Sequence, residues 1–306
     1  MIHSLEVQIP PESQGKRLDK YLSEDLALFP RSQIESRKCR VFAQGKLQKP
    51  GLKLKGLEIF TIIYEDLPEV SYEGEDLPLS IIYEDSRVVV LNKARGMVVH
   101  PAQGNHQGTL VQGLLFHCRG LKDAFPDQPL RPGIVHRLDK ETTGLIIAAK
   151  DPQTLEYLGM QFRKKTTKKI YWAVLKGHLP EKEGEIEGFL TRDPGNRKKF
   201  MIHGSLGKKS HTKYRVLAVK GNYTWVELSP LTGRTHQLRV HMASQGCPIL
   251  GDGVYGRKDK NFPQAPLMLH ALSLQIQLPE GGETQFRAEV PRDFLSILRT
   301  LGWNLF

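Results

Sequence analysis

The sequence predicts an α+β protein of two domains. Segments with the apolar pattern of strands follow one another without a helix between each pair, which argues against a doubly wound or TIM-barrel layout. The charge also changes sign along the chain. Residues 14–60 contain eleven basic and five acidic residues, whereas residues 65–85 contain eight acidic residues and no Lys or Arg. The acidic stretch includes Pro68, Gly74 and Pro78. Because a charge reversal with Pro and Gly is typical of a linker, we place a domain boundary near residue 75.

The composition is that of a folded chain with an anionic partner. The 306 residues include 44 Lys and Arg against 33 Asp and Glu, a net charge of +11, and 39% are hydrophobic. A basic excess favours nucleic acid as the partner. No signal-peptide pattern and no run of 18 apolar residues is present, so we expect a cytoplasmic protein without a membrane span. Cys39, Cys118 and Cys247 are widely spaced and odd in number, which argues for a reducing compartment and against a structural zinc site.

The basic segment is expected to form a small domain of two short helices and a hairpin. Residues 18–26 have apolar side chains at the spacing of one helical face. Ser32 is a candidate N-cap for a second helix that contains Ile34 and ends in a basic cluster. Residues 41–49 have the pattern of a β-hairpin whose turn contains a Gln-Gly pair.

A run of charge is most often a solvated surface, and that interpretation stays open here. Charges on two helices and a hairpin also make a compact phosphate-binding surface, which favours RNA binding. Residues 14–64 resemble the S4-type RNA-binding domain, in which R-L-D-x-x-L opens a helix before a basic second helix. The chain departs from that pattern at residues 55–58, where Lys-Gly-Leu-Glu stands in place of a Lys followed by Gly-Asp. The side chains that we expect to contact RNA in this domain are Arg17, Arg31, Arg37, Lys38 and Arg40.

The remainder of the chain is expected to contain more strand than helix. Apolar runs of strand length predict strands at residues 81–83, 88–91, 144–149, 170–175 and 225–228. Helical spacing predicts helices at residues 109–118 and 155–162 and another that begins after residues 232–233. No P-loop motif is present, and we expect neither a dinucleotide site nor a phosphate-cofactor site.

The segment 133–144 contains the main candidate for a reactive group. A β-branched strand end leads into a polar loop and then into another apolar strand, and such loops often present reactive side chains. Asp139 lies in this loop beside His136, Arg137 and Lys140. Neighbouring cations stabilise the charged form of a carboxylate, which a nucleophile requires. Taken alone, the same pattern also fits a loop aspartate in ordinary salt bridges.

Residues 231–242 form a second motif, in which a Thr-Gly turn precedes a helical pattern with His236 and Arg239 on one side. Arginine pairs well with phosphates and carboxylates, although a charged helix surface is the alternative. His236 and His241 do not share a helical face, so we expect no metal there. A glycine-rich segment, residues 246–256, follows.

A third motif is the basic run from Arg163 to Lys176, which contains six basic residues and no acidic one. Tyr171 lies within this run. Aromatic side chains in a basic surface suit a nucleic-acid strand with a base stacked on the ring. Core packing in a strand is the alternative for Tyr171.

Together these motifs resemble those of the RluA-type pseudouridine synthases. The matching segments are H-R-L-D-x-x-T-T-G-L at residues 136–145, K-x-Y at 169–171, T-G-R-T-H-Q-L-R-V-H at 232–241 and the glycine-rich segment at 246–256. Residues 91–101 resemble the family's first motif, with Ala94 where proline is common. With the S4-type segment ahead of it, the chain is similar to the longer members that modify large-subunit (23S) ribosomal RNA.

The resemblance implies a catalytic domain at residues 76–306 with a mixed, largely antiparallel central sheet, flanking helices and a basic catalytic cleft. The S4-type domain and the acidic linker would occupy residues 1–75. Asp139 would be the catalytic aspartate and Arg239 its partner. Tyr171 would stack on the uracil and could remove the proton from C5.

The implied reaction converts specific uridines in RNA to pseudouridine without a cofactor or a metal. Arg137 would enter the RNA helix and help to displace the target nucleotide, and we expect His136 and Arg234 to contact RNA as well. The expected partner is RNA, with no membrane contact, and we expect a monomer. Attack of the carboxylate at C1′, attack at the uracil ring and a glycal route all stay open.

Two other classes of function also fit the basic surfaces. A non-catalytic RNA-binding protein would have no use for Asp139 opposite Arg239. A nuclease would need a cluster of metal-binding carboxylates, and a retaining glycosidase would need two carboxylates, whereas one stands in a motif here.

Overall fold

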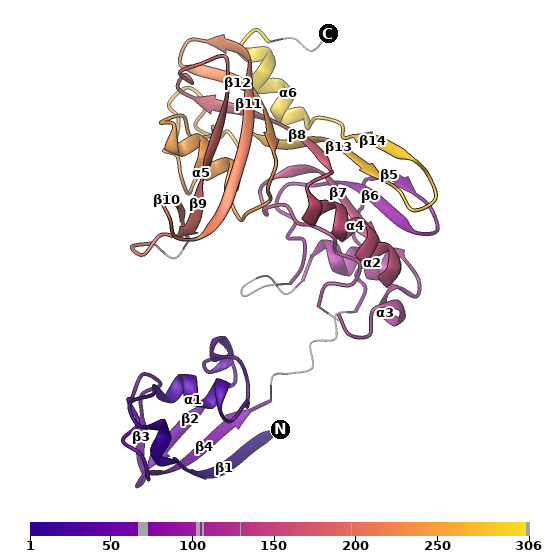
Figure 1. Cartoon of the computed structure of the whole chain (residues 1–306). Helices are drawn as coiled ribbons and strands as arrows, with labels where there is room; N and C mark the ends of the chain where they lie inside the picture. The colour runs from indigo at the N-terminus through magenta and orange to yellow at the C-terminus, as the bar shows by residue number, and fades with distance from the viewer. Residues whose placement is uncertain (67–72, 102–104, 106, 129, 197, 304–306) are drawn as a thin grey trace. The chain divides into compact units, whose positions relative to one another are not determined.

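The computed structural model describes residues 1–66, 73–101, 105, 107–128, 130–196 and 198–303. The chain forms two compact units, Met1–Ser71 and Tyr72–Phe306. Each unit has its own sheet and its own core (Figure 1). Within these described ranges, no helix is both long enough and apolar enough to cross a membrane.

The first unit is a four-stranded antiparallel sheet with one α-helix packed on it. The strands have the order β1-β4-β2-β3. Helix α1 (Leu18–Glu24) buries Leu18 and Leu22 in one cluster with Phe60 and Ile62 of the sheet, as its apolar spacing predicts. The strands are β1 (Ile2–Gln8), β2 (Arg40–Ala43), β3 (Lys46–Gln48) and β4 (Ile59–Glu65).

The predicted hairpin is confirmed, and its turn explains its sequence. Gln44 and Gly45 join β2 to β3 with φ values of 48° and 74°. Two left-handed residues in succession form the turn whose twist matches a two-residue hairpin. Glycine adopts this conformation without a steric penalty, which accounts for its place there.

The predicted second helix is wrong. The chain forms only a 3₁₀ turn at η2 (Arg31–Gln33), followed by turns as far as Lys38, which has a left-handed φ of 47°. Ile34 is the one apolar residue from Arg31 to Lys38, so an α-helix here could not bury an apolar stripe. Arg40 belongs to β2 instead of a helix end. The side chain of Ser32, the proposed cap, lies outside the described structure.

Much of the acidic stretch is bound to the second unit. The Glu73 carboxylate accepts a hydrogen bond from Lys122 at 2.9 Å. The backbone N–H of Glu75 donates to the carbonyl of Gln112, and its carboxylate accepts from the N–H of Gly108. These hydrogen bonds therefore hold residues 73–75 within the second unit.

The second unit is built on one ten-stranded sheet, and the predicted α+β class with a largely antiparallel sheet is confirmed. The strand order is β10-β9-β11-β12-β8-β13-β7-β6-β5, with β14 paired to β13. The strands are β5 (Ile81–Glu84), β6 (Val88–Lys93), β7 (Thr143–Ala149), β8 (Lys168–Lys176), β9 (Glu183–Arg192), β10 (Phe200–His203), β11 (Lys208–Lys220), β12 (Tyr223–Pro230), β13 (Leu269–Gln277) and β14 (Glu283–Arg287). The helices are α2 (Leu110–His117), α3 (Leu121–Ala124), α4 (Pro152–Lys164), α5 (Gln237–Ser244) and α6 (Arg292–Thr300).

Strands β6 and β7 are buried on both faces, which explains their unbroken apolar runs. Alternate side chains of β7 point to opposite faces of the sheet. Ile147 packs in the cluster that contains Leu158 of α4, whereas Ile146 packs in the cluster that contains Leu114 of α2. The two helices therefore cover opposite faces of the same pair of strands (Figure 1).

The starts of these two helices follow ordinary capping chemistry. Thr109 caps α2 and exchanges hydrogen bonds with Gln112 in a capping box. Asp151 caps α4 by accepting the N–H of Thr154, and Pro152 occupies the first helical position. Both helices were predicted from sequence, and both are confirmed.

Strand β13 joins the two halves of the large sheet. It pairs antiparallel with β8 and parallel with β7, where only His270–Thr143 and Ala271–Gly144 are in register. Gly144 has a φ of 110°, and a Cβ built there would lie 2.2 Å from the carbonyl oxygen of Ala271. Glycine is therefore required at this position for β7 and β13 to approach each other.

We predict that Gly144→Ala lowers the free energy of unfolding by about 1–3 kcal/mol, because the new methyl group overlaps the β13 backbone. Urea-induced unfolding followed by circular dichroism measures this change. Gly282→Ala is the matched control, since a Cβ there meets no atom within 4 Å and its φ is outside the left-handed region. Equal stabilities of the two variants would contradict the close approach of β7 and β13.

Candidate active site

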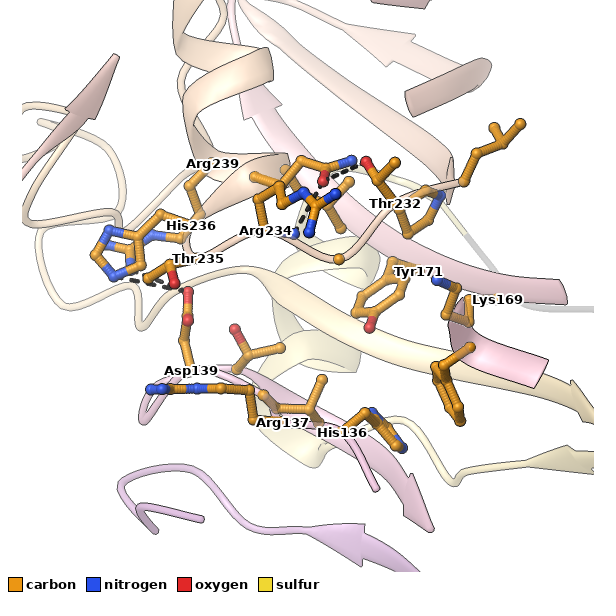
Figure 2. Close-up of a pocket in the computed structure, with 18 of the residues that line it drawn as sticks. His136, Arg137, Asp139, Lys169, Tyr171, Thr232, Arg234, Thr235, His236 and Arg239 are labelled. Carbon is orange, nitrogen blue, oxygen red and sulfur yellow. Dashed lines mark hydrogen bonds and ion pairs between the residues drawn. The ribbon is translucent and has the colours of Figure 1, made fainter. Parts of the chain in front are cut away.

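A pocket of about 540 Å³ opens beside the junction of β7, β13 and β8. It is large enough for a nucleotide-sized ligand. Four segments line it: the loop that precedes β7, the C-terminal part of α4, the start of β8, and the loop that leads from β12 into α5. Figure 2 shows Asp139 near Arg137 and His236, with Tyr171 and Lys169 further along the pocket.

The turn that contains Asp139 accepts hydrogen bonds from residues of β6 and of the loop after β6. The carbonyl of Lys140 accepts hydrogen bonds from the Lys93 ammonium at 3.1 Å and from the N–H of Gly96 at 2.9 Å. The Arg95 guanidinium donates to the carbonyl of Glu141 at 3.0 Å. The backbone of the two residues that directly follow Asp139 is therefore held in place.

Lys93 is a buried cation, with 2% of its surface exposed. Its ammonium also donates to the carbonyls of Ala94 and Met97. Burial lowers the pKa of Lys93 to about 8. Three carbonyl acceptors compensate for much of the lost hydration of the Lys93 ammonium. Because one of them belongs to Lys140, the same ammonium connects the segment of residues 91–101 to the Asp139 turn.

Arg239 binds two carboxylates at once. Its Nε and Nη2 donate to Asp252 at 2.7 and 2.8 Å, and its Nη1 donates to Oδ2 of Asp139 at 3.3 Å. The guanidinium is only 9% exposed. Burial opposes its charge, yet the two carboxylates raise the pKa of Arg239 above its ordinary value. The fork geometry of arginine makes this arrangement possible, because a lysine could not bind one carboxylate in two places and reach a second.

Asp252 is the more tightly held of the two carboxylates. Its side chain is fully buried, and Oδ1 also accepts the N–H groups of Val254 and Tyr255 at 2.8 and 3.0 Å. Burial alone would favour the neutral acid, but these partners and Arg239 hold the pKa of Asp252 below its usual range.

Sequence reasoning missed Asp252. The available signal was an acidic residue between Gly251 and Gly253. Gly251, Gly253 and Gly256 have the spacing G-x-G-x-x-G. The segment is an irregular turn that neither follows a strand directly nor opens a helix, so this spacing does not indicate a dinucleotide site.

His236 stands at the other side of Asp139. Its Nε2 lies 3.9 Å from Oδ2 of Asp139, and its Nδ1 lies 2.9 Å from the hydroxyl of Tyr255. Burial lowers the pKa of His236, so the imidazole is neutral near pH 7. The residue is the N-cap of α5, where it has a left-handed conformation with a φ of 56°. The helical pattern predicts His236 inside the helix, whereas the structure places it just before the first helical residue.

Tyr171 lines the wall of the pocket from β8, where its backbone pairs with Ala271 of β13 and Leu228 of β12. Burial, with the charge of Asp139 adding to it, raises the pKa of the Tyr171 hydroxyl far above its ordinary value. Two residues earlier on the same strand face, Lys169 also lines the pocket, and burial lowers its pKa to about 8.

His136 is a neutral ring in the pocket wall. It stacks on Phe162 with ring centroids 4.6 Å apart, and its Nε2 accepts the N–H of Ile147 at 3.1 Å. Burial lowers the pKa of His136 to about 3. The geometry therefore supports a packing role for this side chain and does not favour the charged RNA contact expected from its neighbours.

Arg137 and Arg234 are both exposed at the pocket and line it. Arg137 has no ion-pair partner within the described ranges, and the Nε of Arg234 donates to the carbonyl of Lys209. Both guanidinium groups keep donors free for a ligand. His241, by contrast, points into the core and lies against Ser210, apart from His236.

In the first unit, most of the predicted RNA-binding side chains already have ion-pair partners. Arg17 and Arg31 both bind the buried Asp19, at 2.9 and 2.7 Å, and the hydrogen bonds from Arg17 are the main reason that the pKa of Asp19 falls to about 2. Arg37 lies 3.6 Å from Asp66, and Lys38 lies 2.8 Å from Glu65. Arg40 is exposed and forms no ion pair with any residue that the structure describes.

Two groups of potential metal ligands lie outside the pocket in the described part of the chain: Glu84, His117 and Cys118, and Glu185, Glu187 and His211. A lysine occupies each group, since Lys150 lies 2.6 Å from Glu84 and Lys213 lies 2.8 Å from Glu185. Both groups are thus charge-paired within the chain.

Comparisons with known proteins agree on one family. The model of the RNA pseudouridylate synthase family matches residues 87–244. The chain is 43% identical over 290 residues to the ribosomal large subunit pseudouridine synthase D of Borreliella burgdorferi, which covers 92% of this chain and 88% of that protein. It is 35% identical over 307 residues to an uncharacterized RNA pseudouridine synthase of Bacillus subtilis, covering 99% of this chain and 100% of that protein.

A solved structure leads to the same family. Human RNA Pseudouridylate Synthase Domain Containing 1 is similar with a TM-score of 0.57 and 29% identity. The match covers 71% of this chain and 86% of that chain.

We predict that His241, at the core side of α5, makes folding stability depend on pH. The side chain is fully buried, and burial lowers its pKa to about 4, against about 6.5 in an unfolded chain. Below pH 6.5 the unfolded chain binds a proton that the folded chain does not. Stability should therefore fall as the pH falls from 6.5 to 4, by up to about 3 kcal/mol from this residue.

Urea unfolding at pH 7 and pH 4.5 measures this loss in the wild type and in His241→Gln. The variant should lose less stability over the same pH range, whereas a change at the exposed His178 (His178→Gln) should leave the pH dependence as it is. An identical pH dependence in the wild type and His241→Gln would contradict a buried neutral imidazole at this position.

Proposed function

Because the chain belongs to the RNA pseudouridylate synthase family, we propose that it converts specific uridines of large-subunit ribosomal RNA to pseudouridine, with Asp139 as the catalytic aspartate. The observation that carries this assignment is a single carboxylate in a nucleotide-sized pocket, held by an arginine whose own charge is shared with a second, buried carboxylate.

The reaction is an isomerisation. The N1–C1′ bond of uridine breaks, the uracil turns, and a C5–C1′ bond forms; C5 loses a proton and N1 gains one. No redox change and no external acceptor is required, so the chain's own side chains suffice. A charged carboxylate serves each route between substrate and product, because it attacks C1′, attacks the uracil ring, or removes the C2′ proton to form a glycal.

Arg239 supports this role because it binds the Asp139 carboxylate through one hydrogen bond and leaves the rest of its hydrogen-bonding capacity unused. Its two shorter bonds go to Asp252, and the one to Asp139 is the longest, at 3.3 Å. The pocket also exposes 19% of the Asp139 side chain, so the carboxylate stays accessible to a ligand. A preorganised charge in a partly desolvated site acts more strongly than the same charge in water.

Tyr171 supplies a stacking surface for the uracil and a hydroxyl near C5. A ring in a basic pocket suits a base that has been turned out of an RNA helix. Since its pKa is raised, the hydroxyl is protonated at rest, so it acts as a relay that accepts the C5 proton while its own proton passes to water at the open side of the pocket.

RNA is held by basic side chains around the pocket and by the first unit. Turning a uridine out of a helix costs about a few kcal/mol, which phosphate contacts from Arg137 and Arg234 offset. The first unit, an S4-type domain in this proposal, adds sequence-independent affinity. The relatives named as ribosomal large subunit pseudouridine synthases support ribosomal RNA as the substrate. We propose that the protein acts on it as a cytoplasmic monomer without a cofactor or a metal.

We predict that Asp139→Asn abolishes pseudouridine formation, because the amide keeps the shape of the side chain and removes its charge. Binding of ribosomal RNA should change little. Pseudouridine mapping of RNA after incubation with the pure variant measures activity, and a filter-binding titration measures affinity. Asp127→Asn, at an exposed aspartate outside the pocket lining, is the matched control and should keep full activity. Turnover by Asp139→Asn near the control rate would rule out the assigned role and would leave an RNA-binding protein as the alternative.

We predict that deletion of residues 2–66 weakens binding to structured RNA and reduces its salt dependence, because fewer phosphates are neutralised. The deletion retains residues 73–75, which are bound to the second unit. Affinities measured between 50 and 200 mM salt, about the range over which phosphate contacts are most evident, test this point. The shortened chain should still modify a short RNA. If it binds and modifies ribosomal RNA as well as the full chain does, the first unit has another purpose.

A further inference from the structure

His236 has a backbone conformation that the local sequence does not demand. It is one of the few described residues other than glycine with a positive φ, and it sits between Thr235 and the first turn of α5. A left-handed histidine costs free energy, and such conformations persist where surrounding contacts hold them. The contacts that hold His236 come from Tyr255 and Phe200.

A chain of hydrogen bonds decides which nitrogen of His236 bears the proton. The backbone N–H of Phe200, in β10, can only donate, and it lies 2.8 Å from the Tyr255 hydroxyl. The hydroxyl oxygen accepts that bond. If it also accepted from Nδ1 of His236, its own proton would have no acceptor among the described residues, so the hydroxyl donates to Nδ1, at 2.9 Å. With Nδ1 accepting, a neutral His236 bears its proton on Nε2.

Nε2 is the nitrogen that faces Asp139. It lies 3.9 Å from Oδ2, the same oxygen that accepts from Nη1 of Arg239 at 3.3 Å. Two groups with protons therefore face one oxygen of the carboxylate from different directions. Oδ1 of Asp139 has no hydrogen-bond partner within the described ranges, so it is the oxygen left free for a ligand.

Tyr255 contacts both of the groups that face Asp139. Its ring centroid lies 5.2 Å from the guanidinium carbon of Arg239, and its ring is perpendicular to that of His236. Its own N–H is bound by Asp252. Tyr255 therefore positions Arg239 through its ring and His236 through its hydroxyl.

We propose that Tyr255 and His236 are positioning residues that orient the Asp139 carboxylate. Tyr255 fixes His236 as the Nε2–H tautomer. Arg239 binds Oδ2 at 3.3 Å, and Nε2–H faces the same oxygen from 3.9 Å, a separation that shortens to a hydrogen bond when substrate occupies the pocket and Oδ1 faces it. This inference rests on the proposed role of Asp139. The fall in the pKa of His236 on burial keeps the ring neutral and supports the tautomer argument.

The tautomer is tested directly, without any activity assay. In a long-range ¹H–¹⁵N correlation spectrum of the full-length protein with ¹⁵N-labelled histidine, His236→Gln identifies the His236 signals by their loss. The wild-type protein should show a protonated Nε2 and an unprotonated Nδ1 for His236. In Tyr255→Phe, which keeps the ring beside Arg239, the signals should shift towards a mixture of tautomers. A wild-type His236 protonated on Nδ1 would overturn the inference.

Kinetics test the orienting role. Tyr255→Phe should lower kcat by roughly 10- to 100-fold with KM nearly unchanged, because the carboxylate is displaced while RNA contacts stay. His236→Gln, which offers an amide N–H in place of Nε2–H, should retain more activity than His236→Leu. Tyr83→Phe is the control: it also removes a tyrosine hydroxyl that donates a hydrogen bond, here to Asp85, but it lies outside the pocket lining and should behave as the wild type.

The outcomes separate this inference from the proposed function. If Asp139→Asn is inactive while Tyr255→Phe has the wild-type kcat, the catalytic aspartate stands and the positioning role is wrong. If Asp139→Asn is active, the proposed function fails, and the spectrum still decides whether Tyr255 sets the tautomer. Equal loss of activity in His236→Gln and His236→Leu would also count against a donated N–H.

Discussion

The pairing of Arg239 with two carboxylates is the interaction on which the rest of the site depends. Asp252 has a fully buried side chain, and a carboxylate there without Arg239 would cost roughly 3–5 kcal/mol. The guanidinium of Arg239 is therefore held beside Asp252, and from this position in α5 it also donates to Asp139. One side chain thereby fixes three segments relative to one another: the turn before β7, the start of α5 and the turn around Asp252. The charge that the site presents follows from the fold around it.

Local patterns were enough to predict elements whose burial is set by nearby residues. Strands β6 and β7 were predicted from unbroken apolar runs, and α2 and α4 from their spacing and caps. The second helix of the first unit, predicted from the candidate cap Ser32, Ile34 and the basic cluster that follows, is wrong because its single apolar residue, Ile34, does not make an apolar stripe. Strands β9 and β11 were not predicted because few of their side chains are buried, so neither contains an unbroken apolar run. Strand β13 was not predicted either, and its pairing with β7 and β8 joins residues that are far apart in the sequence.

The candidate site divides in the same way. Asp139, Tyr171 and Arg239 were selected by motif, and the structure brings all three to one pocket, with their roles still to be tested. Asp252 and Tyr255 were not predicted as site residues because the sequence of a glycine-rich turn does not indicate which distant residues its side chains contact. His136 shows the opposite error. A histidine beside an arginine suggests a charged contact, but burial against Phe162 makes the ring neutral, and burial is a property of the fold.

The place of β13 in the sheet has a consequence for the order in which the chain can be assembled. Strands β7 and β8 are made early in synthesis, yet β13, which begins only at Leu269, must lie between them. Until that strand leaves the ribosome, two apolar sheet edges have no partner and are open to pairing with other chains. The pocket beside this junction forms late for the same reason. A nascent chain that stops short of β13 therefore has its binding motifs but no active site, and it is a natural substrate for chaperones and proteases.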